Sequence, residues 1–261
     1  MRQKWGGRMY QTQEQYKRDI VEVGKLLYEK GLLVGTDGNI SIRVGENEIL
    51  ITASGFCKGK LETKHITKVD LEGKVLSGMK PARDIRMHLA VYREKPEIKA
   101  VVHAHPPVTT GYAMSEISFD KVALPEVLFA LQGIAVTGYT TPTTIEVPRE
   151  VARVLKENPD SRTILLANHG ALTMSTDVYD AFYKMETLEM FTKANLVSRL
   201  IGHTRYLNAS QMEKVNRLIK GEAPDSVIDP SEPEEMRGTV GTDVVEAVVS
   251  EVLHRLKSDR W

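Results

Sequence analysis

The sequence predicts an α/β fold in one domain, and two observations lead to that class. Short apolar runs typical of strands alternate along the chain with segments that carry apolar residues at helical spacing. The chain also has 261 residues, 41% of them apolar, which suits one compact domain, with or without an extension, around a substantial core.

The composition excludes several classes of function. Basic and acidic residues number 35 each, so the net charge is zero and no basic field favours nucleic-acid binding. The single cysteine, Cys57, cannot form an intrachain disulfide, which fits a reducing compartment. No apolar run approaches the roughly 18 residues of a membrane span, and residues 1–8 lack the apolar core of a signal peptide. We therefore expect a cytoplasmic protein.

The N-terminal half is predicted to hold two helices and three strands. Apolar residues at helical spacing, with Gly31 at the C-cap position, predict the first helix. Alternating Ile40 and Ile42 predict the first strand, apolar runs predict the next two, and a periodic apolar set predicts the second helix. In order, these elements are residues 11–30, 40–43, 49–52, 66–70 and 84–94.

The C-terminal half continues the alternation. An apolar run from Ile98 predicts a strand, which Pro106 and Pro107 end because proline has no N–H to donate to a sheet. The methionines and aromatic residues of the long last helix are interpreted as core. The predicted strands are residues 98–105, 134–137 and 163–167, and the predicted helices are residues 108–114, 146–157, 176–201 and 210–219.

Two corners of small residues are candidate anion-binding loops. Residues 35–39 (Gly-Thr-Asp-Gly-Asn) precede the first strand, and residues 53–55 (Ala-Ser-Gly) follow the second strand. Free backbone N–H groups and small side chains let an anion approach closely. Each corner taken alone is equally well explained as a plain turn, but their places at successive strand ends favour convergence on one anion.

Three histidines at strand ends form a candidate metal centre. His103 and His105 lie two residues apart at the end of a predicted strand, so their imidazoles share one face. Neutral imidazole is a common zinc ligand, although two partly buried, hydrogen-bonded histidines are the simpler explanation of the pair taken alone. His169 ends another apolar strand, and with the pair it makes the three nitrogen ligands of an open, catalytic-type site.

Together these motifs resemble the class II aldolase/adducin family, and within it the L-fuculose-1-phosphate aldolase group. The resemblance covers about residues 12–220 and rests on the order and spacing of five motifs. They are residues 35–41 (Gly-Thr-Asp-Gly-Asn-Ile-Ser), 52–55 (Thr-Ala-Ser-Gly), 80–84 (Lys-Pro-Ala-Arg-Asp), 103–105 (His-Ala-His) and 168–170 (Asn-His-Gly). The resemblance implies a three-layer α/β/α sandwich and a homotetramer with its sites between subunits.

The resemblance also implies a metal and an acid–base. The residues that match the family's three zinc-binding histidines are His103, His105 and His169, and Asp84 matches the fourth ligand and catalytic acid–base. These ligand types accept Zn²⁺, Mn²⁺ or Co²⁺. As a Lewis acid, such a cation stabilises the enediolate left when the C3–C4 bond of a ketose phosphate breaks, while Asp84 moves a proton to and from that carbon.

Two residues of the predicted helix 84–94 keep a simpler explanation as well. Asp84 stands in the first turn, where capping and the helix dipole favour an acid without any catalysis. His88, four residues on, lies on the same helix face. His88 either orients Asp84 from behind or only packs the helix.

A phosphate site and a substrate-side loop follow from the resemblance too. The matching phosphate-binding positions are Gly38, Asn39, Ser54 and Gly55. Tyr139 is the candidate catalytic residue of the loop. The chain departs from the aldolases at residues 82–84, which read Ala-Arg-Asp where the aldolases usually carry Ser-Ser-Glu. Arg83 is able to replace the lost hydroxyls with a bidentate contact, and aspartate is what the related pentulose-phosphate 4-epimerases use.

We therefore expect a metal-dependent aldolase that cleaves a deoxy-ketose 1-phosphate, such as L-fuculose 1-phosphate, to dihydroxyacetone phosphate and an aldehyde such as lactaldehyde. The alternatives are a pentulose-phosphate 4-epimerase and a 5-deoxypentulose-phosphate aldolase. A non-catalytic adducin-like module is a third alternative, which the intact set of three histidines and an acid disfavours.

The C-terminal tail is predicted to be separate from the catalytic domain at residues 10–220. Prolines, glycines and acidic residues predict a linker at residues 221–241, and an apolar stripe predicts an amphipathic helix at residues 242–258. That helix either packs on its own oligomer or resembles an encapsulation peptide, which docks enzymes to shell proteins of a bacterial microcompartment. No nucleic-acid or membrane partner is expected.

Overall fold

The computed structural model describes residues 3–5, 8–10, 12–115 and 123–222. The predicted C-terminal helix and most of the predicted linker lie outside these residues. The chain divides into two compact units, Met1–Ile219 and Lys220–Trp261, and the first unit holds every helix and strand named below. Near its start, β1 (Gln3–Trp5) and β2 (Arg8–Tyr10) pair as a short antiparallel hairpin.

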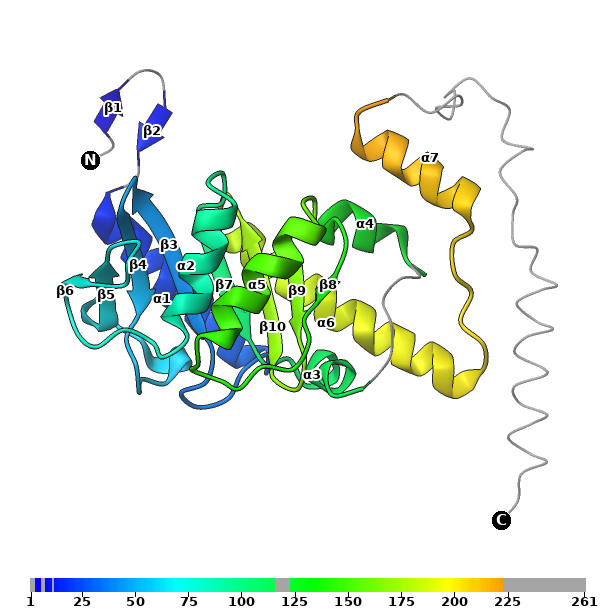
Figure 1. Ribbon diagram of the computed structural model, residues 1–261, viewed down its shortest axis with the longest axis horizontal. Helices are drawn as coiled ribbons and strands as arrows, with labels where there is room; N and C mark the ends of the chain where they lie inside the picture. The colour runs from blue at the N-terminus through cyan, green and yellow to red at the C-terminus, as the bar shows by residue number, and fades with distance from the viewer. Residues whose placement is uncertain (1–2, 6–7, 11, 116–122, 223–261) are drawn as a thin grey trace, which may run out of the picture. The chain divides into compact units, whose positions relative to one another are not determined.

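One eight-stranded sheet forms the middle of the first unit (Figure 1). Its strands are β3 (Asn39–Gly45), β4 (Glu48–Thr52), β5 (Ile66–Val69), β6 (Val75–Ser77), β7 (Ala100–Ala104), β8 (Ala135–Val136), β9 (Thr163–Leu166) and β10 (Gly170–Ser175). In space they run β6-β5-β4-β3-β7-β10-β9-β8. All neighbours are antiparallel except β8 and β9, which are parallel.

Helices cover both faces of the sheet. One face carries α1 (Gln13–Glu29), α3 (Pro107–Ala113), α4 (Pro125–Leu131) and α6 (Val178–Ile201). The other face carries α2 (Ile85–Glu94) and α5 (Glu146–Glu157), which stand in front of the sheet in Figure 1. The short helix α7 (Ala209–Ile219) contacts α4, and two single 3₁₀ turns, η1 (Lys58–Lys60) and η2 (Thr63–His65), follow β4.

The central strand β7 shows why two cores form. Successive side chains of a strand point to opposite faces, so Val102 packs with α1 and α6 whereas Val101 packs with α2 and α5. Both residues are fully buried. The predicted three-layer α/β/α sandwich is therefore confirmed.

The predicted elements are found within a few residues of their expected bounds, but some strands were not anticipated. The most consequential is β10, which begins at Gly170, directly after Asn168 and His169. Asn168 turns the chain with φ of 56°, a left-handed conformation that asparagine tolerates, and β10 then pairs back on β9. Among the helices that the structure describes, none is long and apolar enough to cross a membrane.

Candidate active site

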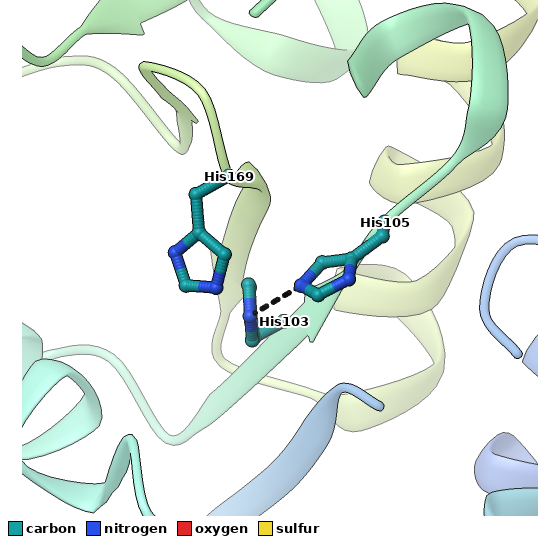
Figure 2. Close-up of side chains that lie close together, drawn as sticks. All are labelled: His103, His105 and His169. Atoms are coloured by element: carbon teal, nitrogen blue, oxygen red, sulfur yellow. Dashed lines mark hydrogen bonds between the residues drawn. The ribbon is translucent and has the colours of Figure 1, made fainter. Parts of the chain in front are cut away.

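The three predicted histidines meet at the ends of two central strands of the sheet. Because β7 and β10 are antiparallel neighbours, the end of β7 lies beside the start of β10. This brings His169, which precedes β10, to His103 and His105, and the three imidazoles face one another (Figure 2). One ring nitrogen from each lies within 4.8 Å of the others, and the Nε2 atoms of His103 and His105 are 3.1 Å apart.

The protonation of these imidazoles suits a cation. His103 is fully buried, and its Nδ1–H donates to the Ala171 carbonyl oxygen at 2.9 Å, which leaves Nε2 without a proton. Burial lowers the pKa of all three imidazoles, so they are neutral near pH 7. Two nitrogens bound to one tetrahedral zinc would lie about 3.3 Å apart, close to the observed 3.1 Å. The donor set therefore fits a divalent cation.

Gly170 is required for this arrangement. A Cβ atom added to it would lie 2.6 Å from the carbonyl oxygen of Ala104 and 2.6 Å from Cδ2 of His105. Those distances are far shorter than any normal contact, so a larger residue would push the β10 strand away from His105. The glycine that follows His169 thus lets His169, before β10, lie close to His105, after β7.

Asp84 lies at the N-terminus of α2, but it does not cap the helix. Its side chain makes no capping hydrogen bond, and Oδ2 instead accepts from Nδ2 of Asn39 at 3.2 Å. The capping explanation therefore does not account for this residue. Asp84 lines the same cavity as His105 and His169. The cluster of possible ligand atoms within 4.8 Å of one another contains the three histidines but not Asp84. A fourth-ligand role for Asp84 stays a prediction.

A cavity of about 260 Å³ opens beside the histidines. The predicted substrate-side residues that line it are Gly38, Asn39, Ser54, Gly55 and Arg83. Both corners of small residues therefore face one space. Gly38 has φ of 70°, and a Cβ added to it would lie 2.7 Å from the carbonyl oxygen of His103, so the first corner rests directly on β7.

Lys58 is a residue of this cavity that the sequence did not point to. Its side chain is 1% exposed, and Nζ donates to the carbonyl oxygens of Thr36 at 2.7 Å and Phe56 at 2.9 Å. The ammonium thus ties the two corners together. Burial lowers the pKa of Lys58 to about 8, against the opposing pull of neighbouring groups that include Asp37 and Asp84. A single lysine after a corner carries no sequence signal for such a role.

Two further acidic or aromatic residues differ in their relation to the cavity, and only Tyr139 of the two was predicted as a site residue. Asp37, from the first corner, places Oδ2 3.8 Å from Nδ1 of His105 and lines the cavity. Tyr139 does not line it: the side chain is 67% exposed, and its loop contributes Pro142 and Thr143 instead. The structure of one chain therefore does not bring Tyr139 to the histidines.

The α/β/α fold and this site define the class of the protein: an enzyme with three neutral imidazoles that suit a divalent metal. The family model of the Class II Aldolase and Adducin N-terminal domain matches residues 18–196. The chain belongs to this family. The predicted family and the predicted metal-dependent lyase class are thereby confirmed, and class II aldolases use a divalent metal.

Similar proteins include more than one activity. The chain is 32% identical over 210 residues to a 3-oxo-tetronate 4-phosphate decarboxylase of Haemophilus influenzae, which covers 78% of this chain and 97% of the relative. It is also 32% identical over 179 residues to an L-fuculose phosphate aldolase of Methanococcus maripaludis, which covers 69% and 95%. A solved L-fuculose 1-phosphate aldolase superposes with a TM-score of 0.73 at 27% identity, covering 81% of this chain and 99% of the other.

Proposed function

We propose that this protein is a divalent-metal aldolase that cleaves a deoxy-ketose 1-phosphate, of the L-fuculose 1-phosphate kind, to dihydroxyacetone phosphate and an aldehyde such as lactaldehyde. The observation that carries the proposal is a cluster of three neutral imidazoles, two of which, His105 and His169, line one cavity together with Asp84. The same cavity is lined by the small-residue corners and by two cationic residues, Lys58 and Arg83, for a phosphorylated substrate.

The metal-side residues have distinct roles in this proposal. His103, His105 and His169 hold Zn²⁺, or Mn²⁺ or Co²⁺ in its place, and Asp84 is the fourth ligand. A cation bound there supplies Lewis-acid stabilisation of the negative charge that develops when the C3–C4 bond breaks. Asp84 carries the proton to and from the carbon of the three-carbon fragment, which requires a carboxylate held at the mouth of the histidine cluster.

The substrate-side residues bind and orient the phosphate. Backbone N–H groups of the two corners are the donors, at the positions Gly38, Asn39, Ser54 and Gly55. Arg83 provides a bidentate contact in place of the hydroxyls that the aldolases usually carry, and buried Lys58 adds a fixed positive charge beside both corners.

Tyr139 has its proposed catalytic role in the cavity of a neighbouring subunit. Its side chain is 67% exposed on a loop that reaches the cavity with Pro142 and Thr143, as a residue that crosses to a partner would be. This requires the homotetramer that we propose, with sites between subunits. Loss of activity on Tyr139→Phe, recovered when inactive His103→Ala subunits are mixed in before reassembly, would support a shared site.

The tail is proposed to direct the enzyme to a location in the cell rather than to take part in catalysis. A catalytic domain at residues 10–220, a linker at 221–241 and an amphipathic helix at 242–258 suit a cytoplasmic enzyme that docks to a microcompartment shell protein. Deletion of residues 224–261 is expected to preserve turnover and to abolish co-sedimentation with shell proteins. Unchanged co-sedimentation would end this part of the proposal.

A second candidate is decarboxylation of a 3-oxo-tetronate 4-phosphate. It is favoured by the relative of that name, which matches 78% of the chain, and by the two cations Lys58 and Arg83, because such a substrate carries a carboxylate as well as a phosphate. The pentulose-phosphate 4-epimerase alternative is favoured by Asp84 in place of glutamate.

One panel of assays separates these functions. The metal-loaded protein is offered the 1-phosphates of fuculose, rhamnulose, ribulose and 5-deoxyribulose with coupled detection of dihydroxyacetone phosphate, and 3-oxo-tetronate 4-phosphate with detection of carbon dioxide. Epimerisation of pentulose phosphates is followed in parallel, and Asp84→Asn is the control. We expect aldol cleavage with the largest kcat/KM on a deoxy-ketose. Carbon dioxide release from 3-oxo-tetronate 4-phosphate, with no dihydroxyacetone phosphate formed from any of the ketose 1-phosphates, would replace the aldolase proposal by the decarboxylase.

A further inference from the structure

A buried chain of hydrogen bonds lies behind Asp84, between α2 and β3. Its contacts are Tyr92 Oη to Ser41 Oγ (2.8 Å), Ser41 Oγ to His88 Nδ1 (2.7 Å), His88 Nε2 to Asn39 Oδ1 (2.5 Å) and Asn39 Nδ2 to Asp84 Oδ2 (3.2 Å). Four residues along a helix span about 6 Å, and two residues along a strand span about 6.8 Å. His88 and Tyr92 on α2 are therefore spaced to match Asn39 and Ser41 on β3.

The interior members of this chain are shut off from solvent. His88 and Ser41 are 0% exposed, Tyr92 is 1% exposed and Asn39 is 3% exposed. Burial lowers the pKa of His88 to about 3, so the imidazole is neutral and carries a single N–H. Burial also raises the pKa of Tyr92, so the phenol keeps its proton.

The direction of each hydrogen bond follows from these protonation states. The Asp84 carboxylate can only accept, so the Asn39 amide turns its NH₂ group to Asp84 and its oxygen to His88, and the one proton of His88 is on Nε2. Nδ1 is then an acceptor, and Ser41 must donate to it. The hydroxyl hydrogen of Ser41 is thereby used, and Tyr92 donates to Ser41. Every donor therefore points along the chain toward the Asp84 carboxylate, an arrangement in which each bond polarises the next.

We infer that His88 is a positioning residue for Asp84, acting through the side-chain amide of Asn39. An asparagine amide can turn by half a rotation, which would set its oxygen against the carboxylate of Asp84. The Nε2–H of His88 opposes that orientation because it pairs with the amide oxygen, and it thereby holds Nδ2 toward Asp84. The inference rests on the proposed function, in which Asp84 moves the proton.

Two substitutions of His88 separate positioning from packing. The amide of His88→Gln extends one methylene further than that of His88→Asn, so Gln can reach Asn39 in place of Nε2 whereas Asn reaches only toward Ser41. We expect His88→Asn to lower kcat at least about tenfold, the effect of losing an aligned hydrogen bond near a charge, with KM and bound zinc unchanged. His88→Gln should stay within about threefold of wild type.

A control shows what loss of a buried hydrogen bond does elsewhere in the sheet. Thr173 donates its hydroxyl to the Ala181 carbonyl oxygen at 2.7 Å and is fully buried. Thr173→Val should lower the melting temperature and leave kcat unchanged. Equal kcat values for His88→Asn and His88→Gln, or losses that track the melting temperature in all three variants, would overturn the positioning role.

A second measurement needs no activity. In the metal-free full-length chain labelled with ¹⁵N-histidine, the His88 signals are those absent from the His88→Gln spectrum. We expect the neutral Nε2–H tautomer from pH 5 to 9, and an Nδ1–H tautomer or an imidazolium would refute the inference. If wild type proves inactive on every sugar phosphate while this tautomer is found, the proposed function fails and the hydrogen-bond chain stands.

Discussion

Replacement of Lys58 by methionine tests whether a buried ammonium links the two corners. Methionine keeps most of the stem volume but removes the charge and both hydrogen bonds to Thr36 and Phe56. Burial lowers the pKa of Lys58 from 10.5 to about 8, a difference that corresponds to about 3.4 kcal/mol at about 1.36 kcal/mol per pKa unit. That free energy is the net cost of keeping this ammonium charged inside the folded protein.

The pH dependence of stability follows from the sign of this change. Between about pH 8 and 10.5 the unfolded chain binds the proton of Lys58 and the folded chain does not, so stability rises with pH. Below about pH 8 both states are charged and the contribution is lost. Relative to Lys58→Met, wild type should therefore gain about 3 kcal/mol of unfolding free energy between pH 7.5 and pH 10.5.

Urea unfolding of both proteins at these two pH values measures the gain, because the difference between them cancels the titration of all other groups. The exposed Lys60, two residues on, is the matched control, and Lys60→Met should show no such gain. Lys58→Met should also raise KM for a phosphorylated substrate more than it lowers kcat. A stability difference that stays flat with pH would refute the buried-ammonium argument.

The remaining predictions concern the histidine cluster and its support. His103→Ala should lose bound metal and turnover together while circular dichroism stays native, and wild-type turnover would refute the metal assignment. Gly170→Ala should lower metal affinity, measured by competition with a chelator, because its Cβ would lie 2.6 Å from the His105 ring. Glu189 is 2% exposed and accepts from the backbone N–H groups of Val108 and Thr109, so Glu189→Ala should cost about 1.5–3 kcal/mol in urea unfolding; a loss below about 0.5 kcal/mol would contradict this.

The candidate metal centre was accessible from the sequence because its pattern is local. His103 and His105 are two residues apart in a strand, and the two-residue period of a strand sets both rings on one side. His169 could be identified for a related reason, because it lies just after an apolar run that predicts a strand, and functional residues often lie at strand ends. The two small-residue corners were recognised by their glycines, which mark turns whatever the surrounding fold.

Other parts of the site depend on contacts that no local pattern encodes. Lys58 is recognisable only once Thr36 and Phe56 present their carbonyl oxygens to it from two separate loops. Asn39 was predicted as a phosphate-binding residue, and the structure shows that its amide also joins His88 to Asp84. Tyr139 was placed in the site by its loop, yet within one chain the side chain is exposed and does not line the cavity.

By itself, the sequence determined the α/β class, the approximate bounds of its main helices and strands, and the residue types gathered for a metal and an anion. These follow from periodicity and turn chemistry, which act over a few neighbouring residues. Only the tertiary structure decided that β10 returns beside β7, that His169 thereby reaches His103, and that hydrogen bonds join His88 to Asp84 through Asn39. Strand pairing and buried hydrogen bonds join residues far apart in the chain, so the whole fold must form before they exist.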